Sequence, residues 1–187
     1  MFQNFHNRTL FRSKSAKSSL LLPLFVVLFS CASDPNKRPS PLRVEKAMIG
    51  GVSVELTYSS PAVRERQIFG KGKEYLEQYG ELWRTGANKA TTIFIDSPLL
   101  VDSIELDSGM YSIFTIPEET EWTLIINENW DQWGSYNYKE SQDVLRLQLQ
   151  AKKLSDVKER MRLFVENDSL KFQWDQTEWA VQLANPL

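Results

Sequence analysis

The sequence of 187 residues contains one histidine, His6, and one cysteine, Cys31, so residues 32–187 contain neither. Zinc sites built from imidazole and thiolate ligands are therefore excluded from that part of the chain. Catalytic arrangements in which histidine is the base for a serine or cysteine nucleophile are excluded for the same reason. Only carboxylates, tyrosine, lysine, arginine and hydroxyl groups remain for catalysis, and we expect neither a metal site nor a cofactor.

The chain also lacks the Gly-rich motifs that bind phosphate groups, because neither GxxxxGK[ST] nor GxGxxG occurs in it. Its 24 acidic residues outnumber its 22 basic ones, and four of the basic residues lie in residues 1–30. Residues 31–187 therefore carry 18 basic and 24 acidic side chains, a net charge of −6. A protein that follows a nucleic-acid backbone needs a basic surface. We expect no nucleic-acid partner.

The beginning of the chain has the pattern of a secretory signal. Four basic residues precede the apolar residues 20–29, and no acidic residue occurs before Asp34. That apolar run has about half the length that a helix needs to span a bilayer. The sequence LFSC, which ends at Cys31, resembles a bacterial lipobox, in which the cysteine is acylated and becomes the new N-terminus.

These features divide the chain into three parts. We expect a lipoprotein signal peptide in residues 1–30, the lipidated Cys31 with a Pro-rich tether in residues 31–42, and a folded domain in residues 43–187. Two acyl chains on Cys31 would anchor the protein stably in a lipid bilayer. The expected location is the bacterial cell envelope, on the outer membrane, facing the periplasm or the cell surface. The alternative is that Cys31 is an ordinary free or buried thiol.

The folded part shows repeated alternation of apolar and polar residues. Period-two runs predict half-buried antiparallel strands at residues 52–58, 145–150, 170–174 and 179–183. Segments that are apolar on both faces predict central strands at residues 91–95, 110–116 and 121–126. Turn signals such as Asn167-Asp168-Ser169 separate the strands. The sequence therefore predicts an all-β, two-layer antiparallel β-sandwich or jelly roll. At most two short helices are expected, at residues 73–79 and 153–159.

Large side chains with polar tips gather near the ends of predicted strands. They are Arg64, Arg66, Trp83, Arg84, Asn88, Trp133 and Tyr136. Arginine offers a planar fork of donors to an anionic group, and tryptophan and tyrosine offer flat apolar faces for stacking. These residues predict a ligand site at one end of the sandwich, for a glycan or a small anionic ligand. Gly86 is expected to permit the turn after Trp83, because it alone there can take positive φ freely. The alternative is a structural corner, in which Trp83 is core and Arg64 or Arg84 pairs with Asp143 or caps a loop carbonyl.

Six segments in order resemble one bacterial family. SPAVRERQIFG, YGELWRTGANKATTI, YSIFTIP, WTLIIN, QWGSYNY and DVLRL are similar to segments of the domain of unknown function DUF2911, which is typical of secreted proteins and lipoproteins. The resemblance spans about residues 43–183, and WRTGAN is its most specific part. It implies a β-rich fold and an envelope location, and it implies no reaction.

Three functions remain open at this point. The first is a binding module for a polar ligand. The second is a hydrolase of the glycosidase type, which holds two carboxylates about 5 Å or about 6.5–9.5 Å apart. Glu65, Glu81 and Asp143 are the carboxylates nearest to the arginine and tryptophan residues, and their spacing does not require a pair. The third is a structural or partner-binding component of an envelope assembly.

The lipobox pattern generates the first testable prediction. Cys31→Ser removes the acylated sulfur, so the variant should move out of the membrane fraction when cells are fractionated. A serine substitution in the tether, Ala32→Ser, serves as the control and should leave the protein in the membranes. Unchanged membrane pelleting of Cys31→Ser would contradict lipidation at this residue.

Overall fold

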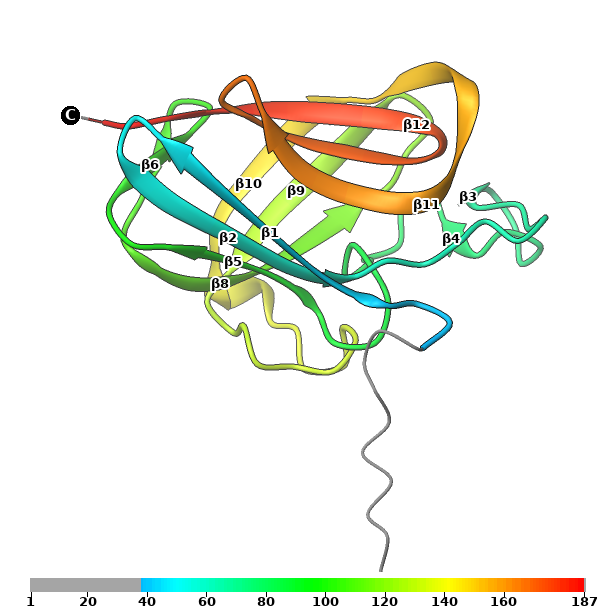
Figure 1. The fold of residues 1–187 in the computed structure, drawn as a ribbon. Helices are drawn as coiled ribbons and strands as arrows, with labels where there is room; N and C mark the ends of the chain where they lie inside the picture. Colours follow the sequence, from blue (N-terminus) through cyan, green and yellow to red (C-terminus); the bar gives the residue numbers. More distant parts are fainter. Residues whose placement is uncertain (1–37, 187) are drawn as a thin grey trace, which may run out of the picture. The chain divides into compact units, whose positions relative to one another are not determined.

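The computed structural model describes residues 38–186 (Figure 1). The predicted signal peptide, the lipidation site at Cys31 and residues 32–37 of the tether lie outside the described residues. Within residues 38–186, no helix has the length and apolar character needed to cross a membrane.

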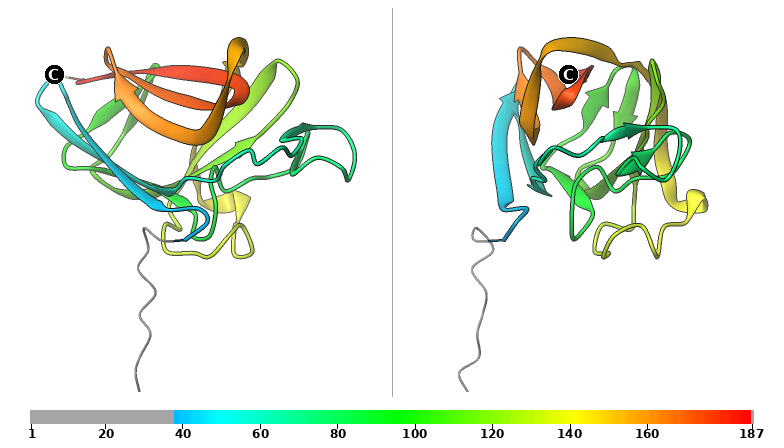
Figure 2. Two further views of the ribbon diagram at one scale, coloured as in Figure 1. Left: turned by 45° about the vertical axis from the view of Figure 1, so that its right-hand side comes forward. Right: turned by 90° about the vertical axis from the view of Figure 1, so that its right-hand side faces the viewer.

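The described chain forms two packed antiparallel sheets and one short parallel pair. The larger sheet has the strand order β1-β2-β5-β8-β9-β10, the smaller one has the order β11-β12-β6-β7, and β3 pairs with β4. Both views of Figure 2 show the β11–β12 hairpin as a layer separate from the larger sheet. The predicted all-β sandwich is confirmed. The strands are β1 (Leu42–Ile49), β2 (Val52–Ser59), β3 (Phe69–Gly70), β4 (Glu77–Gln78), β5 (Thr91–Ile95), β6 (Leu99–Val101), β7 (Ile104–Leu106), β8 (Gly109–Ile116), β9 (Glu121–Asn127), β10 (Asp143–Gln150), β11 (Lys152–Glu166) and β12 (Ser169–Ala184).

Two-residue turns set the register of the hairpins. The β11–β12 turn places Asn167 and Asp168 at φ values of 50° and 52°, and Glu166 then pairs with Ser169. Asparagine and aspartate tolerate this left-handed conformation, which matches the twist of the flanking strands. The turn predicted at these residues is confirmed.

The core lies between the two sheets. The segments predicted to be central, β5, β8 and β9, occupy the middle of the larger sheet, as expected from their apolar residues on both faces. An aromatic cluster fills the space between the sheets. Phe172 and Trp174 come from β12 and Trp122 from β9, and all three are at most 1 % exposed. The rings of Trp122 and Phe172 lie 5.4 Å apart between centroids, so the cluster joins one sheet to the other.

Strand β12 changes the face that it buries halfway along its length. Phe172 and Trp174 are buried in its first half, and Trp179 and Val181 are buried in its second half. Since side chains alternate strictly along a regular strand, this change from even to odd positions requires an irregular residue. Asp175 provides it with a φ of 52°, and the pairing with β11 shifts in register on both sides of Lys158, which pairs with Asp175.

The two predicted helices are wrong, because both segments pair with distant backbone. Residues 153–159 lie in β11, where Lys153 pairs with Thr177 of β12. In residues 73–79, the amide of Glu77 donates to the carbonyl of Ile68 at 2.9 Å, which builds the parallel β3–β4 pair. Tertiary pairing thus overrides the local preference for helix. The helical element within the described residues is a single 3₁₀ turn, η2 (Glu140–Gln142).

The aromatic cluster predicts which substitutions unfold the protein. Phe172→Ala should lower the free energy of unfolding by about 3–5 kcal/mol, because it leaves a cavity where three indole rings and the Phe69 ring now pack. Lys171→Ala, on the opposite face of the same strand, removes only an ion pair with Glu166 and should cost less than about 1 kcal/mol. Denaturant titration measures both values. Equal losses in the two variants would contradict this account of the core.

Candidate functional site

Trp83 lies in the core and not at the surface. Its backbone exchanges two hydrogen bonds of 2.8 Å with Thr115 of β8, and its indole nitrogen donates to the carbonyl of Gly86 at 3.1 Å. Its ring stacks on Trp174 with 5.7 Å between centroids and 22° between planes. Because the side chain is 2 % exposed, Trp83 cannot contact a ligand at the surface. Its role is to anchor the segment that follows it.

The turn after Trp83 is held in an unusual backbone conformation. Gly86, which was expected to take positive φ freely, has a φ of 157°, and Thr85 and Asn88 also have positive φ values, 51° and 63°. A positive φ is costly for a β-branched residue such as Thr85, and the Thr91 hydroxyl donates to its carbonyl at 2.6 Å. Gly86 is required by close approach, because a Cβ there would lie 3.1 Å from the carbonyl oxygen of Ser59. The turn is therefore tightly determined by its surroundings.

The three arginines of the predicted site differ in exposure and in hydrogen-bond partners. The exposed guanidinium of Arg66 donates to the carbonyls of Val63 and Ala62 at 3.1 and 2.5 Å, and thus closes its own loop. The exposed Arg64 has a φ of 49°, and its amide donates to the Glu159 carboxylate at 3.1 Å. The third arginine, Arg84, is half-buried, and its enclosed Nε has no hydrogen-bond partner among the described residues.

Glu77 on β4 is a titratable group that the sequence did not single out. Burial raises the pKa of its carboxyl to about 7, and the nearby positive charges of Arg84 and Arg66 oppose that rise. Neither arginine lies within 4 Å of the carboxylate, so the charge is not compensated by an ion pair among the described residues. The charges of Arg84 and Arg66 therefore both act on the half-buried carboxyl of Glu77.

The backbone at Asn88 and Lys89 contacts the exposed loop that follows β9. The amide of Gly134 donates to the carbonyl of Asn88 at 3.0 Å, and Lys89 forms a β-bridge with Trp133. Trp133 is 53 % exposed and Tyr136 is 85 % exposed. The structure thus brings Asn88, Trp133 and Tyr136 into neighbouring loops at one end of the larger sheet.

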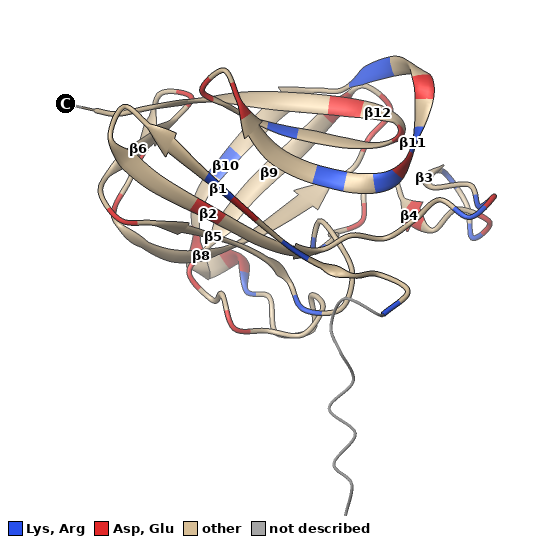
Figure 3. Ribbon diagram, viewed as in Figure 1, with Lys and Arg blue, Asp and Glu red and all other residues tan. Residues whose placement is uncertain are grey.

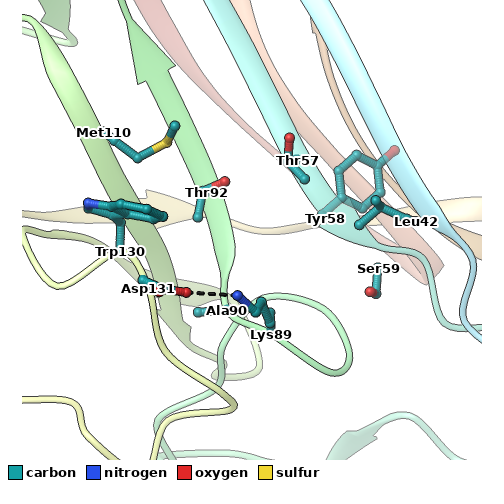
Figure 4. A pocket seen from close by; sticks show the side chains of 10 residues that line it. All are labelled: Leu42, Thr57, Tyr58, Ser59, Lys89, Ala90, Thr92, Met110, Trp130 and Asp131. Atoms are coloured by element: carbon teal, nitrogen blue, oxygen red, sulfur yellow. Dashed lines mark hydrogen bonds and ion pairs between the residues drawn. The ribbon is translucent and has the colours of Figure 1, made fainter. Parts of the chain in front are cut away.

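A groove of about 260 Å³ lies beside these loops, on the face of the larger sheet that points away from the core (Figure 4). Thr57 of β2 and Thr92 of β5 are paired neighbours on this face, because the residues beside them in sequence point into the core. Figure 4 shows Trp130 and Met110 on one side of the groove, Thr57 on the other and Thr92 between them. These side chains form an apolar floor with hydroxyl groups.

One ion pair closes the groove at the end formed by the loops. The Lys89 ammonium lies 2.7 Å from the Asp131 carboxylate, and Trp130, the residue before Asp131, is 46 % exposed. No other charged side chain lines the groove among the described residues, so its lining has no net charge. An exposed indole beside hydroxyls and a neutralised ion pair can stack on a ring and hydrogen-bond to groups around it.

Sequence reasoning missed most of these groove residues. Trp130 and Asp131 stand directly before the segment QWGSYNY. The predicted site included Trp133 and Tyr136 of that segment but neither of the two residues before it. Thr57 and Thr92 lie at alternate positions of predicted strands, where a polar residue is expected on any exposed face. The signal for Trp130 was therefore present, while nothing local distinguished the two threonines from ordinary surface residues.

The carboxylates proposed for a hydrolase are dispersed. Glu65 and Glu81 are exposed. Asp143 accepts hydrogen bonds from Tyr138 and Arg146, each at 2.7 Å, so its partner is Arg146 and neither Arg64 nor Arg84. Burial and the Asp143 carboxylate raise the pKa of Tyr138 to about 12. Asp143 therefore ties the loop after β9 to β10. Among residues 38–186 no group of three potential metal ligands comes together.

Glu77 makes stability depend on pH in a defined direction. Its pKa is about 7 in the folded protein and 4.5 when unperturbed, so between these values the folded state holds a proton that the unfolded state has released. Stability should therefore fall as pH rises from about 4.5 to about 7, by a total of about 3 kcal/mol. Glu77→Gln, which cannot ionise, should lack this loss and be more stable than the wild type at pH 8.

Denaturant titration at pH 4, 6 and 8 measures this difference. The control is Glu74→Gln, at an exposed position of the loop between β3 and β4. This variant should keep the pH dependence of the wild type. If Glu77→Gln lost stability with rising pH as steeply as the wild type, the assignment to Glu77 would be contradicted.

Comparison with known proteins gives one match. The sequence model of the family described as "Protein of unknown function (DUF2911)" matches residues 40–183, which include β1 to β11 and nearly all of β12. No curated protein and no solved structure matches the chain significantly. The resemblance carried by WRTGAN and the segments around it is confirmed, and the chain belongs to the DUF2911 family of proteins of unknown function.

Proposed function

We propose that this protein is a membrane-anchored envelope lipoprotein whose domain binds a neutral glycan in the groove beside Trp130. The observation that carries the proposal is the half-exposed indole of Trp130 on one side of a groove that has no net charge and bears hydroxyl groups. The lipoprotein part rests on the leader and the LFSC sequence at Cys31.

The chemistry of the groove suits a sugar ring. A pyranose has a face of C–H groups, which packs on an indole, and a rim of hydroxyls, which need donors and acceptors. The threonines Thr57 and Thr92 supply hydroxyls on the floor, and the Lys89–Asp131 pair supplies donors and acceptors at one end. A few polar groups placed in a mostly apolar hollow are typical of small-ligand sites.

The charge of the lining favours a neutral ligand over an anionic one. Lys89 and Asp131 neutralise each other, and Arg64, Arg66 and Arg84 do not line the groove. A carboxylate or phosphate placed there would lie near the Asp131 carboxylate without an arginine fork to bind it. The glycan alternative therefore has the better physical support at this site.

Trp130→Ala tests the proposal. On an array of neutral oligosaccharides, including glucans, mannans and xylans, the wild type should retain at least one glycan. The variant should bind that glycan at least about tenfold more weakly, or by about 1.4 kcal/mol, because the stacking surface is lost. Titration calorimetry with the retained oligosaccharide measures the change.

The matched control is Trp133→Ala, in the same loop. Trp133 is also exposed and does not line the groove, so its removal should leave the affinity within about twofold of the wild type. The proposal fails if no neutral glycan is retained, if only charged glycans bind, or if Trp130→Ala binds as tightly as the wild type.

A further inference from the structure

A second hollow lies where the two sheets meet at strand β1, and it shares the lining residue Tyr58 with the groove. It has a volume of about 200 Å³ and is bounded by β1, the end of β2 and β11. Arg43 comes from β1, and Arg160 and Arg162 come from β11. The single carboxylate in its lining is Glu45, so the hollow carries an excess of positive charge on a chain whose residues 31–187 are acidic overall. Figure 3 shows basic positions along β11 and at the start of β1, two strands that are in contact.

Two of the three guanidinium groups are held by contacts, and none of the three is neutralised by an ion pair among the described residues. Arg160 donates to the carbonyls of Ser60 at 3.2 Å and Pro39 at 3.4 Å, and the guanidinium carbon of Arg162 lies 4.6 Å from the centre of the Phe164 ring. None of the three arginines forms an ion pair within 4 Å among residues 38–186. Their positive charges are therefore available to an anion from outside the described chain.

Tyr58 lies near the charges of Glu45, Arg162 and Arg43. Its ring is buried at the seam between the sheets, and burial raises the pKa of its hydroxyl. Arg162 and Arg43 act on that hydroxyl in the opposite direction, which places a charge from each sheet beside one phenol. The hollow is thus built on a rigid part of the fold, since Tyr58 and Met161 beneath it are both core residues.

The hollow is near the start of the folded chain. Arg160 binds the carbonyl of Pro39, and Pro39 is eight residues after Cys31. Eight residues span at most about 29 Å even when fully extended. If Cys31 is acylated as proposed above, the arginines cannot be farther than about that distance plus one side chain from the membrane surface. This step rests on the proposed lipid anchor and is independent of the glycan groove.

We propose that Arg43, Arg160 and Arg162 form a site for the phosphate of an anionic phospholipid headgroup in the membrane that holds the anchor. Guanidinium groups bind phosphate oxygens through paired, charge-assisted hydrogen bonds. A basic surface held near a membrane is attracted to anionic lipids, and each basic residue close to the surface strengthens that attraction. The bound headgroup would orient the domain on the bilayer, with the β1–β11 seam toward the lipid.

Chemical modification of arginine tests this site residue by residue. The protein purified from membranes is mixed with vesicles of phosphatidylcholine alone or with phosphatidylglycerol added, and is treated with phenylglyoxal. Mass spectrometry then gives the modification rate at each arginine. In phosphatidylglycerol vesicles Arg43, Arg160 and Arg162 should react at least about threefold more slowly than in phosphatidylcholine, because charge-assisted hydrogen bonds protect them. The exposed Arg64 lies outside the hollow and should show no such difference.

Two further arms identify the source of the phosphate. Inorganic phosphate without vesicles should not protect Arg43 and Arg162, and protection by phosphate alone would replace the lipid with a soluble anion as the ligand. The double variant Arg43→Gln/Arg162→Gln should lose the protection of Arg160, while Arg64→Gln should retain it. Equal modification rates in both vesicle types would overturn the proposal.

The result can be separated from the fate of the proposed function. The intact mass of the purified protein reports acylation of Cys31 directly, and the glycan array reports the groove. Added vesicles present headgroups to acylated and lipid-free protein alike. The protection assay therefore still tests the arginine site if Cys31 is not acylated or if no glycan binds.

Discussion

The packing of aromatic rings between the two sheets is the interaction on which the rest of this structure depends. Residues 32–187 contain no cysteine, so no disulfide can join the sheets and burial of apolar area must do so. Phe172 stacks on Trp179 within the smaller sheet and contacts Trp122 of the larger one, with centroids 5.2 and 5.4 Å apart. Large rings bury the most area per residue, and edge-to-face contacts add a geometric preference. The two sheets are therefore held at one separation and in one relative orientation.

Trp83 fixes the position of a surface segment relative to the aromatic cluster. Its ring belongs to the aromatic cluster, while the chain after it turns sharply through Thr85 and Gly86. The position of Lys89 is thereby tied to the core, and Lys89 meets Asp131 beside Trp130 at the end of the groove. A corner built for stability and a hollow suited to binding are thus consecutive parts of one segment. Trp83, the first residue of WRTGAN, is core, and Lys89, the residue directly after it, lines the groove.

The sequence by itself determined the all-β class and the central strands. Period-two alternation records which face of each strand is buried, and that information is local, as in β10 and both halves of β12. Turn chemistry is local too, so Asn167 and Asp168 marked their hairpin correctly. Local preference failed at residues 153–159, where pairing with β12 decides the conformation. The apolar pattern of the sequence indicated the change of buried face between Trp174 and Trp179. It did not indicate that Asp175 is the irregular residue that produces this change.

Only the tertiary structure decided which polar and aromatic residues share a surface. Trp83 and Trp133 have the same side chain in similar Gly-containing segments, and one is 2 % exposed while the other is 53 % exposed. Thr57 and Thr92 face one groove because β2 and β5 pair in one register, which depends on strands far apart in the chain. The arginines of the β1–β11 seam likewise come from opposite ends of the domain. A sequence states which groups are present, but non-local pairing and burial determine which of them meet and which remain open to a ligand.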